Sequence, residues 1–217
     1  MTVVKICGIT NLADARGAIA AGADMLGFNF YGRSPRFVEP QKAQEIIARL
    51  RTELNADASS VKIAGVFVDE PSVESLLCIA HATGLDAVQL HGEESVEFCR
   101  KLKEHAPDLL IIKVLRASDG FQPEDAARYE TEAIMLDAFH PDLRGGTGQV
   151  VDWTVGRRTR ALVPRLFLAG GLSPENVSEA IAQVQPYAVD VCSSIEWAPG
   201  LKNGERVRAF ISAVRSS

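Results

Sequence analysis

Short runs of consecutive apolar residues alternate along this chain with longer segments in which apolar residues recur every three or four positions. In the short runs, the apolar residues are adjacent rather than alternating, which is typical of strands covered on both faces. The longer segments have the spacing of amphipathic helices. Eight strand-length runs begin near Val3, Asp24, Val61, Asp86, Leu109, Ala133, Pro164 and Tyr187. The pattern therefore predicts a strand followed by a helix, repeated eight times.

Residues with strong positional preferences mark the predicted helix starts. Pro40, Pro71 and Pro174 are each predicted to open a helix, where the fixed φ of proline fits and its missing N–H would have had no partner. Thr10 or Asn11 can cap the first helix, because either side chain accepts from a free N–H of the first turn. Cys7 is therefore predicted to lie where the first strand ends and this helix approaches.

Eight such repeats, with no break in composition, predict a single α/β domain over residues 1–217, folded as a (β/α)8 TIM barrel. Periodicity alone leaves an open doubly wound sheet as the alternative. Two predicted strand-to-helix connections, 29–39 and 138–150, exceed the usual 2–6 residues and suggest binding loops or lids. In a barrel, this is the side on which active sites are built.

The composition is that of an ordinary globular protein, with 47% apolar and 24% charged residues. No apolar run approaches the roughly 20 residues that span a bilayer, and the N-terminus has no signal-like segment, so we expect a cytoplasmic protein. A net charge of −5 predicts no general attraction to nucleic acid or to anionic membranes. The four cysteines lack metal-ligand spacing, and we interpret Cys78 and Cys99 as packing residues on apolar helix faces.

Several residues with useful chemistry fall at predicted strand ends or in the long loops. Arg33 and Arg36 flank a Ser-Pro turn, and a rigidly held guanidinium suits a carboxylate or phosphate; for Arg33 a solvated loop charge is the better interpretation. Asp137 ends a very apolar strand, where a carboxylate must be paired or used. His91 also ends a strand, and we interpret it as a supporting hydrogen-bonding residue.

The last two predicted strands end in small residues. Gly170 and Gly171 follow the seventh, and Ser193 and Ser194 follow the eighth. Barrels often bind phosphate between these two loops, where backbone N–H groups are accessible. We therefore predict a phosphate site there. Cys7 alone would be interpreted as a small buried hydrophobe, but it is predicted to lie at the same edge as all these residues.

With these residues in place, the chain closely resembles the phosphoribosylanthranilate isomerase family of tryptophan biosynthesis. The resemblance spans essentially the whole chain. It rests on the segments Lys5-Ile6-Cys7-Gly8-Ile9-Thr10, 27–38, Gly65-Val66-Phe67-Val68, Val88-Gln89-Leu90-His91-Gly92, Leu136-Asp137, Gly145-Gly146-Thr147-Gly148 with Asp152-Trp153, Leu168-Ala169-Gly170-Gly171-Leu172, and 190–200.

The resemblance implies a (β/α)8 barrel that needs no metal or organic cofactor. It implies an aldose–ketose isomerase that converts N-(5'-phosphoribosyl)anthranilate to 1-(o-carboxyphenylamino)-1-deoxyribulose 5-phosphate by an Amadori rearrangement. The expected partner is this small phosphorylated aminosugar, and both monomers and homodimers occur in such barrels.

Residue by residue, the resemblance makes Cys7 the general base and Asp137 the general acid. Arg36 matches the arginine that receives the anthranilate carboxylate. The phosphate cradle matches Gly170, Gly171, Ser193 and Ser194, while Lys5 and His91 are expected to support the site.

The chain departs from the family pattern at the eighth strand. The usual run is Val-Ser-Ser-Gly-Val-Glu, whereas this chain has Val191-Cys192-Ser193-Ser194-Ile195-Glu196. Ser194 thus replaces a glycine expected near the phosphate.

Two alternative functions remain open. One is the related sugar-phosphate isomerase of histidine biosynthesis. That enzyme carries an aspartate at the base position, so Cys7 argues against this alternative. A non-catalytic phosphate-binding barrel would not need both Cys7 and Asp137.

Overall fold

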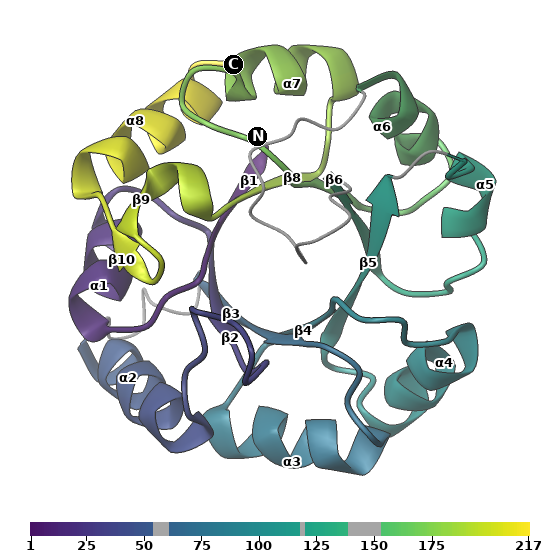
Figure 1. Cartoon of the computed structure of the whole chain (residues 1–217), viewed down its shortest axis with the longest axis horizontal. Helices are drawn as coiled ribbons and strands as arrows, with labels where there is room; N and C mark the ends of the chain where they lie inside the picture. The colour runs from purple at the N-terminus through teal and green to yellow at the C-terminus, as the bar shows by residue number, and fades with distance from the viewer. Residues whose placement is uncertain (54–60, 118–119, 139–152) are drawn as a thin grey trace.

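The computed structural model describes residues 1–53, 61–117, 120–138 and 153–217. Parallel strands close into a barrel in chain order, each hydrogen-bonded to the next and the last to the first (Figure 1). The barrel strands are β1 (Val3–Cys7), β2 (Met25–Asn29), β3 (Lys62–Phe67), β4 (Ala87–Leu90), β5 (Leu110–Ala117), β6 (Ala133–Ala138), β7 (Leu166–Leu168) and β8 (Ala188–Val191). The predicted (β/α)8 barrel is confirmed, and the open doubly wound sheet is excluded.

Helices surround the barrel and alternate with its strands (Figure 1). They are α1 (Leu12–Ala20), α2 (Pro40–Glu53), α3 (Val73–Thr83), α4 (Val96–His105), α5 (Pro123–Ala126), α6 (Trp153–Arg160), α7 (Val177–Val184) and α8 (Gly204–Arg215). Within the described ranges, none of these helices is long and apolar enough to span a bilayer.

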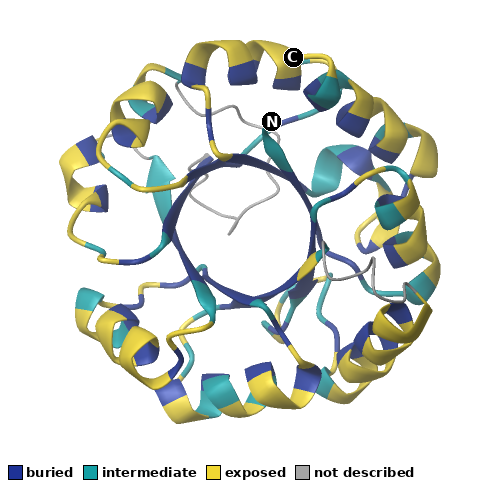
Figure 2. Ribbon diagram, turned by 180° about the vertical axis from the view of Figure 1, so that it is seen from behind, coloured by how far each residue is buried: buried dark blue, intermediate teal, exposed yellow. Residues whose placement is uncertain are grey.

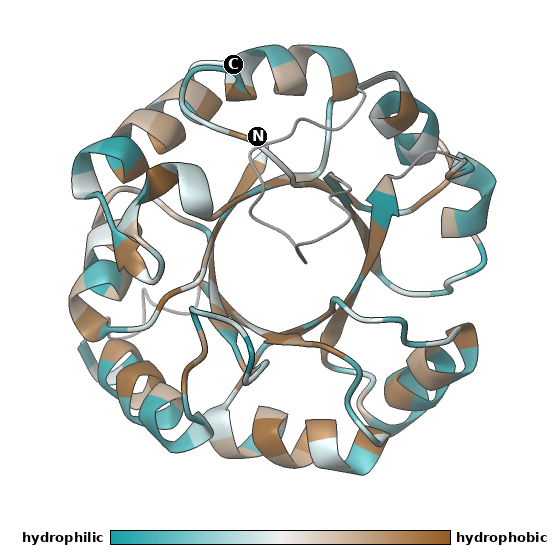
Figure 3. Cartoon of the chain, viewed as in Figure 1, coloured by the Kyte–Doolittle hydropathy of each residue, from teal (hydrophilic) through white to brown (hydrophobic). Residues whose placement is uncertain are grey.

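Buried apolar residues form two clusters, one on each side of the barrel wall. The larger lies between strands and helices and includes Val4, Ile6 and Leu26. The smaller fills the barrel and includes Met25, Met135 and Phe167. The wall is therefore buried on both faces, whereas each helix is buried only on its inner side (Figure 2). The hydropathy colouring shows the same division (Figure 3). Two-sided burial explains why the strands are apolar at consecutive positions.

The alternation along each strand also determines which polar side chains face the barrel interior. Lys5 and Cys7 alternate with Val4 and Ile6, which belong to the outer cluster. Asp137 follows Met135 of the inner cluster by two positions, and successive side chains point to opposite faces of a sheet. Polar residues at every second position near the carboxyl ends of the strands therefore gather at one end of the barrel.

Some predicted boundaries need correction. Pro40 is the first residue of α2, but α3 begins at Val73, after Ser72 caps it by accepting from Ser75 N at 3.1 Å. Pro71 therefore precedes the cap rather than opening the helix. Likewise α7 begins at Val177, three residues after Pro174. Cys99 packs in the core as expected, whereas Cys78 is exposed, so its interpretation as a packing residue was wrong.

The segment after β8 contains structure that the periodicity did not predict. A 3₁₀ turn, η2 (Ser193–Ile195), leads into an antiparallel hairpin formed by β9 (Glu196–Ala198) and β10 (Leu201–Lys202). The hairpin lies beside the mouth of the barrel, next to α1 and α8 (Figure 1). It carries two charged residues, Glu196 and Lys202, to that mouth.

Candidate active site

A cavity of about 510 Å³ opens at the carboxyl ends of the barrel strands. Its walls bring together residues from seven strand ends or the loops that follow them. The predicted residues among them are Cys7, Arg36, His91, Asp137, Gly170, Gly171 and Ser193. Arg33, interpreted from the sequence as a solvated loop charge, is exposed but also lines this cavity. The glycine-rich segment 145–148 and Asp152 lie outside the described residues.

Cys7 ends β1 with its side chain almost fully buried. A hydrogen bond with the Cys192 thiol is the largest influence on its pKa, and it outweighs the effect of burial. The ammonium groups of Lys5 and Lys202 add to this effect, so the pKa of Cys7 lies well below that of an ordinary thiol. The pKa of Cys192 is raised by the same hydrogen bond and by burial. Cys7 is therefore the thiol of this pair that ionises.

Lys5 lies two residues before Cys7 on β1 and is completely buried. Its Nζ donates to Asp190 Oδ1 at 2.7 Å, which compensates a charge that would otherwise be costly to bury. Burial opposes its charged form, but Asp190 and Cys7 together raise the pKa of Lys5. Burial likewise raises the pKa of Asp190 to about 7, against the attraction of Lys5. Lys5 therefore supplies a fixed positive charge near the Cys7 thiol, on the same strand.

Asp137, at the end of β6, is buried next to His91, with His91 Nε2 3.3 Å from Asp137 Oδ2. The imidazole is fixed on its other side by Gln89, whose Nε2 lies 3.2 Å from His91 Nδ1. An amide nitrogen only donates, so this contact is a hydrogen bond in the tautomer whose Nδ1 accepts. Among the described residues, His91 Nε2 has no well-aligned hydrogen bond. His91 thus lies in contact with Asp137 without a well-formed hydrogen bond to it.

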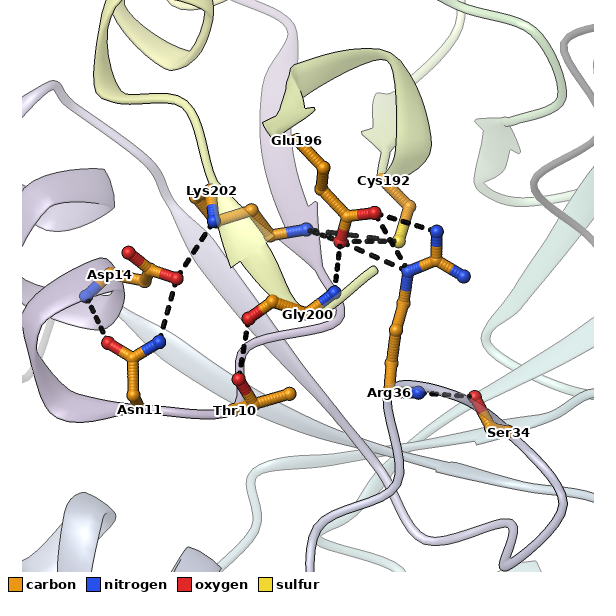
Figure 4. A network of polar contacts seen from close by, with 9 residues as sticks. All are labelled: Thr10, Asn11, Asp14, Ser34, Arg36, Cys192, Glu196, Gly200 and Lys202. Carbon is orange, nitrogen blue, oxygen red and sulfur yellow. Dashed lines mark hydrogen bonds and ion pairs between the residues drawn. The ribbon is translucent and has the colours of Figure 1, made fainter. Parts of the chain in front are cut away.

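Arg36 extends from the long loop after β2 toward Glu196 of the hairpin (Figure 4). Its Nη2 lies 2.6 Å from Glu196 Oε2, and its Nε lies 3.0 Å from both carboxylate oxygens. Lys202 Nζ donates to Glu196 Oε1 at 2.8 Å. Burial favours the neutral carboxyl, but these two cations lower the pKa of Glu196. The guanidinium is thus held by a carboxylate that is itself fixed.

One contact attaches the hairpin to the first strand-to-helix loop, and another attaches it to the first turn of α1 (Figure 4). Thr10 Oγ1 donates to Gly200 O at 2.6 Å, and Lys202 N donates to Asp14 Oδ2 at 2.9 Å. Asp14 in turn lies on α1, whose cap is Asn11 rather than Thr10. The residues that surround Cys7 and those that hold Arg36 therefore belong to one connected network.

Gly8 directly follows Cys7 in the chain and has a φ of +75°, a conformation that glycine adopts readily. A Cβ at this position would lie 2.7 Å from Arg36 Cδ and 2.9 Å from Cys192 Sγ. Both distances are too short for real carbon contacts. The glycine therefore permits the close approach of Arg36 and Cys192 to the Cys7 loop.

The two loops expected to bind phosphate face the cavity from the side of β7 and β8. Gly170 and Gly171 both have positive φ, of 81° and 66°, and Ser193 opens η2. Ser194 is different, because it is not among the residues that line the described cavity. Its hydroxyl donates to Leu172 O at 2.5 Å and so connects the two loops.

Several residues of this site were not predicted from the sequence. Asp190 and Cys192 follow Ala188 at every second position, and Ala188 packs inside the barrel. The same alternation that places Asp137 could have identified them. Glu196 and Lys202 had no such signal, because a short hairpin outside the barrel positions them.

The chain matches the family model described as N-(5'phosphoribosyl)anthranilate (PRA) isomerase over residues 4–213. It is 45% identical over 215 residues to the N-(5'-phosphoribosyl)anthranilate isomerase of Syntrophus aciditrophicus, a match that covers 99% of this chain and 88% of the relative. It is 44% identical over 217 residues to the enzyme of that name from Rubrobacter xylanophilus, with 100% of both chains covered.

Solved structures agree. The phosphoribosyl anthranilate isomerase of Thermotoga maritima superposes with a TM-score of 0.89 at 40% identity, covering 100% of each chain. A phosphoribosyl anthranilate isomerase in complex with reduced 1-(o-carboxyphenylamino)-1-deoxyribulose 5-phosphate superposes with a TM-score of 0.85 at 40% identity, again over 100% of each chain. Monomers of the dimeric Thermotoga maritima enzyme superpose with a TM-score of 0.83 at 38% identity over 100% of each chain.

Proposed function

The chain belongs to the N-(5'-phosphoribosyl)anthranilate isomerase family, and we propose that it catalyses the Amadori rearrangement of N-(5'-phosphoribosyl)anthranilate in tryptophan biosynthesis. The product is 1-(o-carboxyphenylamino)-1-deoxyribulose 5-phosphate. The observation that carries this proposal is the pairing of an ionisable thiol, Cys7, with a buried carboxyl group, Asp137, in the wall of one cavity. An isomerisation of this type needs one group to give a proton and another to remove one.

The reaction begins when Asp137, as the general acid, gives a proton to the ring oxygen of the aminosugar. The bond between this oxygen and the first ribose carbon breaks, and a cationic imine forms. The Cys7 thiolate then removes the proton from the second ribose carbon, giving an enolamine that tautomerises to the ketone. Cys7 is suited to this step because its lowered pKa increases the thiolate fraction near neutral pH.

Arg36 binds the anthranilate carboxylate. Glu196 occupies Nε and Nη2, while Nη1 points away from Glu196 (Figure 4). This third nitrogen, together with the free edge of Nη2, is available to a carboxylate that enters the cavity. Arginine is suited to this role because its planar guanidinium stays charged and donates from several directions.

The ribose phosphate binds between the loops after β7 and β8. Gly170, Gly171 and Ser193 line the cavity there, and residues without large side chains allow backbone N–H groups to approach a phosphate. Ser194 contributes through its backbone, because its hydroxyl is bonded to Leu172 O. Lys5 stabilises the Cys7 thiolate and His91 supports Asp137.

We further propose that residues 1–217 act as one barrel domain and that the enzyme works in the cytoplasm, where small phosphorylated precursors of amino acids are made. The Thermotoga maritima relative is a dimer that also yields monomers, so either state is compatible with a complete cavity in one chain.

The proposal is tested by adding the purified protein to freshly made N-(5'-phosphoribosyl)anthranilate, whose fluorescence falls on conversion. We expect turnover at a rate that is proportional to protein concentration. A parallel sample with the aminoaldose substrate of histidine biosynthesis measures the alternative reaction. Turnover of that substrate alone would contradict the proposed function.

A further inference from the structure

Cys7 and Cys192 are neighbours across the junction of β1 and β8. The strands pair in register, with Lys5 opposite Asp190 and Ile6 opposite Val191, so the next step brings Cys7 beside Cys192. Neighbouring strands lie about 4.8 Å apart, which is within the window of about 4.4–6.8 Å between the Cα atoms of disulfide-bonded cysteines. Both side chains line the same cavity, and each thiol is close enough to shift the pKa of the other.

The surroundings of this dithiol favour reaction with an oxidant. Both cysteines line the open cavity, so a small molecule can reach them. Lys202 Nζ lies 3.8 Å from Cys192 Sγ, and Lys5 is buried beside Cys7. A thiolate in a cavity wall among positive charges is a usual environment of an oxidation-sensitive cysteine. Cys99 is the contrast, because burial raises its pKa to about 11.

We propose that Cys7 and Cys192 form a disulfide when the protein meets a hydroperoxide, and that this modification reversibly blocks the active site. In the first step, the Cys7 thiolate attacks the terminal peroxide oxygen. The O–O bond breaks, the leaving oxygen takes a proton and departs as an alcohol or water, and Cys7 becomes a sulfenic acid. Cys7 is oxidised by two electrons and the peroxide is reduced by two.

In the second step, the sulfur of Cys192 attacks the sulfur of Cys7. The S–S bond forms, the S–O bond breaks, and the hydroxyl group departs with the Cys192 proton as water. A dithiol reductant reverses the modification by thiol–disulfide exchange. The loss of activity rests on the proposed role of Cys7 as the base, whereas the formation of the disulfide does not.

The experiment uses the full-length protein with Cys78→Ser, which removes the exposed thiol and therefore disulfides between molecules. The protein is treated with hydrogen peroxide, and its mass, its free thiols and its tryptic peptides are measured. We expect two of the three remaining thiols to be lost, the mass to fall by two hydrogen atoms, and a single linked peptide pair to contain Cys7 and Cys192. Activity should fall in parallel and return with dithiothreitol.

The matched control adds Cys192→Ser, the residue type that the family pattern carries at this position, so the fold should be kept. This variant should gain oxygen atoms on Cys7 under the same treatment and form no internal link. A gain of oxygen on Cys7 with Cys192 left as a free thiol in the Cys78→Ser protein would overturn the proposal. If the linked peptide forms in a protein that never turns over the substrate, the disulfide stands and the proposed function fails.

Discussion

The guanidinium of Arg36 and the carboxylate of Glu196 form an ion pair, in which Nη2 lies 2.6 Å from Oε2 and Nε lies 3.0 Å from both carboxylate oxygens. The Glu196 side chain is only 3% exposed and that of Arg36 only 16%. A pair so shielded from water is screened less than one on the surface. Glu196 therefore determines where the positive charge of Arg36 lies in the cavity.

Replacing Glu196 with glutamine should raise KM by about tenfold and change kcat much less. The amide keeps the shape of the side chain but removes the charge that holds the guanidinium, and a hydrogen bond to a charged group contributes about 1.5–3 kcal/mol. Steady-state kinetics measure the split between KM and kcat. Glu205→Gln, at an exposed glutamate at the start of α8, is the control. A fall in kcat at constant KM would mean that Glu196 acts on the chemistry rather than on Arg36.

Replacing Arg36 with methionine should mainly raise KM, since it removes carboxylate binding that the ground and transition states share. The effect should shrink for a substrate analogue without the anthranilate carboxylate. Arg33→Met, in the same loop but exposed, should change KM less. If Arg36→Met weakened both substrates equally, Arg36 would not be the residue that binds the carboxylate.

Lys202→Gln should move the acid limb of the pH profile of kcat/KM to higher pH. The base acts as a thiolate, and the nearby ammonium lowers the pKa of Cys7. Loss of that charge raises this pKa, so a higher pH is needed to form the thiolate. The acid limb of kcat/KM reports the pKa of the base in the free enzyme. The control is Lys62→Gln, at an exposed position, which should leave the limb where it is in the wild type. An unmoved limb in Lys202→Gln would exclude Lys202 from tuning the base.

The Ser194→Gly variant should bind the phosphorylated product as tightly as the wild type. Its free energy of unfolding should fall by about 1 kcal/mol, because the substitution removes the hydrogen bond to Leu172 O. Ser194→Asp should in addition repel the phosphate. Product inhibition and chemical denaturation measure the two effects separately, and Ser193→Ala, which keeps its backbone donor, should be mild in both. A large loss of product affinity in Ser194→Gly would show that the hydroxyl itself contacts the phosphate.

The sequence predicted the barrel because its strands must be apolar on both faces, and this requirement is visible as consecutive apolar residues. Cys7, His91 and Asp137 could be assigned to one edge because the carboxyl ends of parallel strands meet there. The partner of Arg36 could not be assigned, since Glu196 lies 160 positions away and is positioned by a hairpin rather than by a strand. Nor does any pattern reveal that the Ser194 hydroxyl donates to a neighbouring loop.

The central claim is that Cys7 is the general base, and the turnover of N-(5'-phosphoribosyl)anthranilate by Cys7→Ser tests it most directly. A serine hydroxyl has nearly the same size as the thiol but is far too weakly acidic to form the base, and general base catalysis contributes at least about 10²-fold. We predict that turnover falls by this factor or more while product affinity stays nearly unchanged. Turnover above about a tenth of the wild-type rate would contradict the account.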